Sequence, residues 1–261
     1  MPLRVSAIHA TPIKSLRLES LDEAELTPTG ITDDRRFVLV DPSSRVMTQR
    51  EIGALATISA SYDPVEDHLV VTLPGGERVD GQPRQGEPFE TQLWGEPVAG
   101  SIVAGPWAEA ITGVAGRDLR LVRVEDGPAL GKDSVAVSML GEESLAELQR
   151  RGRLPDAPEA RRFRPTLLLR GGDPHEEDAW VGQRVQAGNA VLRVVRLDPR
   201  CSLTTRNPET GDRDLDTLRL IASYRPPDGD KQVYFGVYAD VEAPGIVRVG
   251  DSVHPLTKDA P

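Results

Sequence analysis

The sequence contains a single cysteine, Cys201, among its 261 residues. One thiol cannot close a disulfide within the chain, so the disulfide frameworks of small secreted domains are excluded. The four histidines show none of the close spacings that zinc ligands adopt; they are His9, His68, His175 and His254. A zinc hydrolase is therefore not expected.

Aromatic residues and long apolar runs are also scarce. Aromatics make up 4% of the chain, and no run approaches the roughly 20 apolar residues that a membrane span needs. The first residues, MPLRVSAIHATPIK, lack the apolar stretch of a secretory signal. With a net charge of −10, neither nucleic acid nor an anionic membrane is an expected general partner. We expect a cytoplasmic protein with no membrane or nucleic-acid partner.

Glycine and proline, by contrast, are plentiful, at 24 and 22 residues. Together with short apolar, β-branched runs they predict a mainly β fold with a few short helices (α+β). The clearest predicted strands cover residues 5–13, 18–26, 37–40, 68–73, 119–124, 166–169, 191–197, 233–241 and 246–253, and the predicted helices begin after Pro106 and at Glu142. Residues 217–224 are predicted as helical or mixed, and residues 75–88 as an exposed, turn-rich segment. A boundary near Arg117 gives two domains, residues 1–116 and 117–261.

Common catalytic motifs are missing from the sequence. It has neither the G-x-S-x-G nucleophile elbow nor a G-x-G-x-x-G after a strand. Residues 127–134 approach a phosphate-binding P-loop, but only three residues separate the glycines and Asp133 follows the lysine where Ser or Thr is required. By elimination, Cys201 is the main chemical candidate.

Cys201 follows the apolar run at residues 191–197, which predicts a strand that Asp198-Pro199 ends because proline has no N–H for the ladder. A thiol on a turn next to Arg200 is placed to ionise, and the thiolate is the nucleophile and metal ligand. A lone cysteine is otherwise often a buried apolar filler. The residues alone leave these two interpretations level.

Three other polar segments have both a functional and a structural interpretation. Lys14-Ser15 suit a phosphate or carboxylate, but such residues usually lie at the surface, and that is the favoured interpretation. Asp34-Arg35 form either a ligand contact or a pair that holds the fold. The arginines at residues 161–164 form either an anion site or a solvated loop, and the acidic residues 173–180 form either a lid or a partner for those arginines.

Seven short motifs lie along nearly the whole chain. In chain order they are Pro12-Ile13-Lys14-Ser15, Asp34-Arg35, Thr48-Gln49-Arg50-Glu51, Arg162-Phe163-Arg164-Pro165, Glu177-Asp178-x-Trp180, Arg200-Cys201-x-x-Thr204-Thr205 and Ser223-Tyr224-Arg225. The ordered set resembles the MOSC superfamily, in the two-domain form that includes the mitochondrial amidoxime-reducing components and their bacterial relatives. The resemblance implies an N-terminal MOSC β-barrel-like domain and a C-terminal MOSC β-barrel domain that carries the cysteine.

The resemblance implies a molybdenum cofactor (Mo-molybdopterin), with Cys201 as the metal ligand and Arg200 beside it as the second catalytic residue. Soft thiolates suit such a metal centre. The pterin and its phosphate would lie in the cleft between the domains and contact Lys14, Ser15, Arg35, Asp133, Arg164, Thr166 and Thr204. The superfamily is also associated with pyridoxal phosphate binding.

The implied activity is reduction of small N-hydroxylated or other N-oxygenated substrates, with electrons from an external iron–sulfur, flavin or haem protein, because no four-cysteine segment is present. Two positions depart from the family pattern: Asp198 replaces a frequent second cysteine, and Thr166 replaces an asparagine. The alternatives are a sulfur carrier or transferase with a Cys201 persulfide, and a non-catalytic anion-binding module.

Overall fold

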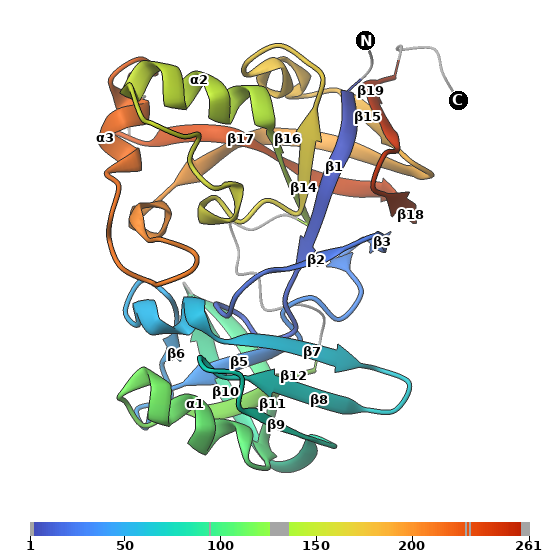
Figure 1. Ribbon diagram of the computed structural model, residues 1–261. Helices are drawn as coiled ribbons and strands as arrows, with labels where there is room; N and C mark the ends of the chain where they lie inside the picture. The colour runs from blue at the N-terminus through green and yellow to red at the C-terminus, as the bar shows by residue number, and fades with distance from the viewer. Residues whose placement is uncertain (1–2, 94, 126–135, 228, 230, 257–261) are drawn as a thin grey trace.

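The computed structural model describes residues 3–93, 95–125, 136–227, 229 and 231–256. Strands dominate the described residues, and only three α-helices occur among them. The predicted mainly β architecture with few short helices is confirmed. Figure 1 shows two β-rich halves, one above the other.

The upper half is a closed barrel. Its sheet has eight strands, of which seven form a ring because β14 also pairs with β1, which leaves β2 outside the ring. Val5, Met139 and Leu192 are fully buried inside it. The sheet order is β14 (Leu167–Arg170), β13 (Val137–Gly141), β17 (Val233–Ala243), β16 (Ala190–Arg200), β15 (Arg184–Ala187), β19 (Ser252–Pro255), β1 (Leu3–Ala10) and β2 (Glu19–Leu21). A small sheet of β18 (Gly245–Arg248), β3 (Glu23–Thr27) and β4 (Gly30–Ile31) packs beside the barrel.

The lower half holds two further sheets. One contains β10 (Arg84–Leu93), β11 (Glu96–Ala104), β12 (Arg120–Val124), β5 (Phe37–Val40) and β6 (Val46–Met47), and the other contains β7 (Ser59–Asp63), β8 (His68–Thr72) and β9 (Arg78–Gly81). Trp107 anchors helix α1 (Trp107–Ala115) between them, since it is only 1% exposed and its Nε1 donates to the Leu69 carbonyl at 3.1 Å.

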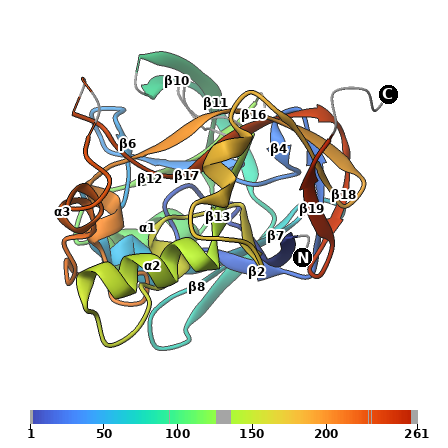
Figure 2. The same ribbon diagram turned by 90° about the horizontal axis from the view of Figure 1, so that it is seen from above.

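The predicted helices are present. α1 follows Pro106 and ends at Gly116, whose φ of 63° is the left-handed cap that glycine favours. Helix α2 (Glu142–Gly152) has the expected acids in its first turn and arginines in its last. Helix α3 (Thr217–Ala222) covers part of the mixed segment and lies next to α2 on the outside of the barrel (Figure 2).

One local expectation is wrong, and two others are met only in part. Asp198-Pro199 does not end β16, because irregular pairing between Leu197 and Pro199 places the missing N–H where the ladder is already broken. Residues 75–88 are largely exposed, but they contain β9 and the start of β10 rather than turns alone. Residues 173–180 include a 3₁₀ helix, η3 (Glu176–Trp180), in which Asp178 pairs with Arg225 rather than with the arginine loop. The lid alternative for this segment stays a prediction.

The chain passes between the two halves more than once. β1 lies in the barrel before the chain enters the lower half, and β12, just after the predicted boundary, pairs with β5 and β11 of the lower half. The division at residues 116 and 117 stays a prediction. Among the described residues, no helix combines the length and apolar character needed to cross a membrane.

The two halves are in contact where the 3₁₀ segment η1 (Gly53–Thr57) packs closely against the turn that follows the cysteine and contains Gly211. A Cβ on Gly211 would lie 2.1 Å from the Gly53 carbonyl oxygen. Arg206 donates to the Gly211 carbonyl within the same turn at 2.7 Å, and across the contact to the Arg50 carbonyl at 3.0 Å. Glycine is therefore required at this contact between the halves.

We predict that Gly211→Ala destabilises the protein more than Gly250→Ala. Both glycines have left-handed backbones, with φ of 78° and 95°, which cost an alanine about 1–2 kcal/mol. Only Gly211 would also force its Cβ into backbone, whereas nothing lies within 4 Å at Gly250; such overpacking costs a further ~1–3 kcal/mol. Urea unfolding of both variants measures the difference, and equal losses would contradict the contact.

Candidate functional site

A cavity opens between the two halves, next to the cysteine. Eight of the nine residues predicted from the sequence as site residues line it, from segments far apart in the chain. They are Lys14, Ser15, Arg35, Arg164, Thr166, Arg200, Cys201 and Thr204. The ninth, Asp133, lies outside the described residues. The individual roles assigned to these residues stay predictions.

Lys14 and Ser15 lie on the turn that follows β1, and their surface interpretation is wrong. They are only 8% and 5% exposed, because the Lys14 N–H donates to the Phe37 carbonyl at 2.8 Å and draws the turn against β5. Burial lowers the pKa of Lys14 to about 7, with further lowering from Arg35 and Arg164. A buried ammonium among other cations favours an anionic ligand.

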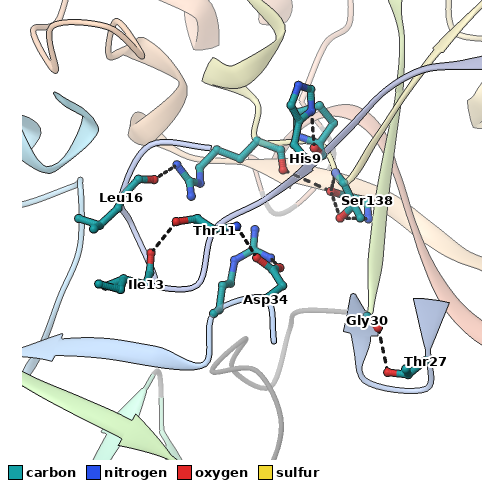
Figure 3. Close-up of polar contacts among 12 residues, drawn as sticks. His9, Thr11, Ile13, Leu16, Thr27, Gly30, Asp34 and Ser138 are labelled. Carbon is teal, nitrogen blue, oxygen red and sulfur yellow. Dashed lines mark hydrogen bonds and ion pairs between the residues drawn. The ribbon is translucent and has the colours of Figure 1, made fainter. Parts of the chain in front are cut away.

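Asp34 and Arg35 form a pair that holds the fold, and Arg35 also lines the cavity, where it could contact a ligand. One Asp34 oxygen accepts from the Thr11 backbone N–H at 2.8 Å, as Figure 3 shows, and the other forms an ion pair with Arg35. The acid thereby fixes the entry to the lower half, while the guanidinium lines the cavity.

The three arginines of residues 161–164 point to different partners. Arg162 is held by Asp214 through two contacts of 2.6 and 2.7 Å, and Arg161 pairs with two glutamates, one of them Glu159 at 3.0 Å. Arg164 donates through Nη1 to the Leu16 carbonyl at 2.9 Å, a bond drawn in Figure 3. The loop is therefore not simply solvated, and its three arginines do not all point to one anion site.

Arg164 retains unused donor capacity. Its Nη2 is buried and has no hydrogen-bond partner among the described residues. Burial, followed by the nearby charge of Arg35, lowers the pKa of Arg164 to about 9. An unpaired buried donor of this kind is costly unless a ligand accepts from it.

Three residues that line the cavity, two of them arginines, have strained backbones. Ser15, Arg35 and Arg164 all have left-handed backbones, with φ of 72°, 52° and 52°. Each such non-glycine residue costs about 1–2 kcal/mol, and strain of this kind concentrates at functional sites. The backbone thus holds these three residues at the cavity at a cost in stability.

Cys201 is half-buried and lies between the end of β16 and the 3₁₀ segment η4 (Ser202–Thr205). Its carbonyl accepts from the Thr204 N–H at 3.2 Å and from the Thr204 hydroxyl at 3.1 Å, which fixes the start of η4. Because Cys201 lines the cavity rather than one of the apolar cores, the filler interpretation is disfavoured.

The Arg200 side chain bonds to backbone carbonyls of two other segments, which the sequence did not reveal. Its Nε and Nη2 donate to the Phe235 carbonyl at 2.7 and 2.5 Å, and its Nη1 donates to the Phe163 carbonyl at 2.7 Å. Nη2 also lies 2.7 Å from an oxygen of Asp198. The guanidinium therefore ties β16 to β17 and to the arginine loop, instead of being free to attend the thiol.

Sequence reasoning missed several lining residues, including Arg50, Ser138 and Tyr238. Arg50 follows Thr48, whose N–H and hydroxyl both donate to Glu51, at 3.0 and 2.7 Å, and so shape the loop. The sequence motif Thr48-Gln49-Arg50-Glu51 contains Arg50 but does not indicate what the side chain does. Tyr238 could be found only from the strand register, which pairs it with Arg196 on β16.

Protein-family models match both halves of the chain. A model described as the MOSC N-terminal beta barrel domain matches residues 2–104, and one described as the MOSC domain matches residues 126–254. The chain belongs to the MOSC superfamily. The MOSC domain match includes Cys201, and the match to the N-terminal domain includes Lys14 and Arg35.

Individual relatives are more distant. Mitochondrial amidoxime reducing component 2 from Bos taurus is 28% identical, over 97% of this chain and 83% of the relative. Molybdenum cofactor sulfurase from Solanum lycopersicum is 23% identical, over 96% of this chain and 35% of the relative. The crystal structure of the YUAD protein from Bacillus subtilis aligns over 98% of both chains with 13% identity and a TM-score of 0.45, too low to support an argument.

We predict that Lys14→Met stabilises the ligand-free protein most at and below pH 7. Because burial lowers the pKa of Lys14 from 10.5 to about 7, the unfolded chain binds more protons between these values, and wild-type stability rises with pH across that window. The variant's advantage, on the order of a few kcal/mol, therefore shrinks toward pH 10.5.

Urea unfolding across this pH range measures the effect. Lys231→Met, at an exposed position, is the matched control and leaves the pH profile unchanged. Parallel profiles for wild type and Lys14→Met would contradict the buried charge.

Proposed function

We propose that the protein binds a molybdenum cofactor in this cavity through Cys201 and reduces small N-hydroxylated compounds. The observation that carries the proposal is the juxtaposition of a half-buried thiol with a cation cluster that lines the same cavity, formed by the buried Lys14 and the half-buried Arg35 and Arg164. The superfamily membership and the amidoxime-reducing and sulfurase relatives support a role connected with the molybdenum cofactor.

The residues present fit such a group chemically. A pterin phosphate needs cationic donors, and the unpaired Nη2 of Arg164 is one such donor directed at no protein acceptor among the described residues. Arginine suits bidentate phosphate contacts, and Lys14 would act as a point charge. The single thiol supplies the soft ligand that a redox-active metal favours.

The cofactor, when bound, supplies the two-electron redox chemistry, while the protein supplies binding and electrostatics. Lys14 takes up a proton when phosphate approaches, since an added negative charge reverses the lowering of its pKa. Cys201 gives up its proton to act as a ligand. Arg35 and Arg164 hold the phosphate in place from opposite halves of the molecule.

Hydroxyl groups around the cavity are already partly engaged. The Thr166 N–H donates to the Ser138 hydroxyl at 2.9 Å, and the Ser138 N–H donates to the Thr166 hydroxyl at 3.2 Å. The threonine in place of the family's asparagine therefore joins β13 to the start of β14. Thr204 is similarly engaged, with its hydroxyl 2.7 Å from that of Thr217.

Reduction of an N-hydroxylated substrate requires electrons from outside the chain. These 261 residues contain one cysteine, so they do not themselves supply the thiolates that hold an iron–sulfur cluster. A separate iron–sulfur, flavin or haem protein is the proposed donor.

A sulfur-transfer role is the second candidate. It is favoured by the sulfurase relative and by the accessibility of Cys201. Intact-mass measurement of freshly purified protein distinguishes the two: a persulfide on Cys201 without molybdenum supports sulfur transfer, while stoichiometric molybdenum and pterin support the reductase.

We predict that Cys201→Ser abolishes reduction of benzamidoxime and other N-hydroxylated test compounds. The hydroxyl is a poor ligand for the metal, but the cation cluster that binds the phosphate is intact, so the variant retains pterin. Metal analysis, pterin fluorescence and turnover with a chemical reductant measure all three quantities. Metal-loaded wild type that turns over no N-hydroxylated compound would refute the proposed activity.

We predict that Arg164→Met weakens cofactor retention about 10- to 100-fold, because it removes a charged donor worth ~1.5–3 kcal/mol. Arg161→Met is the matched control from the same loop; its guanidinium faces Glu159 and Glu209, so it changes retention little. Equilibrium dialysis against free cofactor measures both variants. Equal retention would show that Arg164 is not a phosphate ligand.

A further inference from the structure

Asp198 and Tyr238 occupy one wall of the cavity and have no part in the cofactor contacts proposed above. They come from neighbouring strands, β16 and β17. Asp198 is only 1% exposed, whereas Tyr238 is half-buried. The tyrosine therefore lies between the buried carboxyl and more accessible space.

The Asp198 carboxyl has close neighbours but poorly directed bonds. Tyr238 contacts it through the hydroxyl, and Arg200 Nη2 lies 2.7 Å from Oδ2. Neither carboxyl oxygen, however, accepts a well-formed hydrogen bond among the described residues. Arg200 is instead aligned with the carbonyls of Phe235 and Phe163. The structure thus leaves the carboxyl incompletely stabilised as an anion.

The charge balance at this wall favours an acid that exchanges a proton near neutrality. Burial raises the pKa of Asp198 to about 7, and Arg200, the Tyr238 contact and Arg196 offset part of the rise. Burial and the neighbouring carboxyl raise the pKa of Tyr238 as well, so it retains its hydroxyl proton. The remaining charged groups that line the cavity are Lys14, Arg35, Arg50, Arg162 and Arg164.

We propose that Asp198 and Tyr238 form a proton-delivery pair for cleavage of the substrate N–O bond. This inference rests on the proposed reductase function. The overall step is R–NH–OH + 2e⁻ + 2H⁺ → R–NH₂ + H₂O: the N–O bond breaks, the substrate is reduced, and the external donor protein is oxidised. Tyr238 passes one proton toward the departing oxygen and is reprotonated by Asp198. The second proton comes from solvent, and Asp198 regains its own through Tyr238.

The arrangement suits this task for a physical reason. A general acid works best when its pKa lies near the operating pH, and one correctly placed contributes roughly 10²–10⁴-fold in rate. The tyrosine is a relay rather than the acid, because its proton is held too tightly to be lost without replacement. Arg196, with its guanidinium carbon 5.0 Å from the ring centroid, covers Tyr238 and helps fix it.

The test compares cofactor-loaded wild type with Asp198→Asn and Tyr238→Phe in single turnovers of a chemically reduced protein. Asn keeps the volume of Asp198 but carries no exchangeable acid proton. The controls are Asp240→Asn, at an exposed position of β17, and Tyr224→Phe, whose hydroxyl faces His175. Molybdenum and pterin contents are measured for every variant, so that rates are expressed per loaded site.

The expected wild-type rate falls as pH rises through about 7, since the acid must be protonated. Asp198→Asn and Tyr238→Phe each lower the rate about 100-fold, and Asp198→Asn also removes the pH dependence, while both controls match wild type. A wild-type rate without this pH dependence, or per-site rates of Asp198→Asn and Tyr238→Phe equal to wild type, would overturn the inference but leave the reductase function standing. Loaded wild type without turnover would end both.

A second readout needs no cofactor. Because the Asp198 pKa is raised from 3.8 to about 7 in the folded protein, the folded state binds more protons, and wild-type stability is lost as pH rises across that window. Urea unfolding should therefore show Asp198→Asn gaining stability relative to wild type from about pH 4 to 7, whereas Asp240→Asn shows no such trend. A constant difference would mean that the carboxyl does not hold a proton and would overturn the inference.

Discussion

The enclosure of cations at the contact between the two halves is the constraint on which the rest of the structure depends. Lys14, Arg35 and Arg164 meet there although the protein as a whole carries a net charge of −10. Burial, followed by the charges of neighbouring arginines, lowers the pKa of Lys14 to about 7 and that of Arg164 to about 9. Left-handed backbone at Arg35 and Arg164 adds a further cost. A bound anion would offset these costs, which is the physical basis for the proposed cofactor site.

The path of the chain explains why the cations meet. β1 belongs to the barrel, but the turn that follows it carries Lys14 into the lower half, where its backbone bonds to Phe37. Arg164, from the barrel half, donates to the carbonyl of Leu16 on that same turn and so links the turn back to the barrel. The halves are therefore joined by the same segments that line the cavity, and displacement of one half relative to the other would separate Cys201 and Arg164 from Lys14 and Arg35.

Much of this could be predicted from the sequence, because the informative residues are local. Strand patterns, the capped helices and the polar surroundings of Cys201 require only neighbouring residues to interpret. Lys14 could not be placed by itself, since its burial depends on β5, more than twenty residues away. Pro199 was misleading because its effect depends on a bulge in β16. The position of Tyr238 at the cavity and the bonds of Arg200 to backbone carbonyls depend on strand register. Residue patterns along the sequence do not determine that register.

The most direct test of the account is molybdenum X-ray absorption spectroscopy of the purified, cofactor-loaded protein beside its Cys201→Ser variant. If Cys201 anchors the metal among these cations, the wild-type spectrum requires one more sulfur neighbour of molybdenum than the variant spectrum. Identical sulfur counts in two equally loaded proteins would contradict the account, because the metal would then be held without the only thiol in the chain.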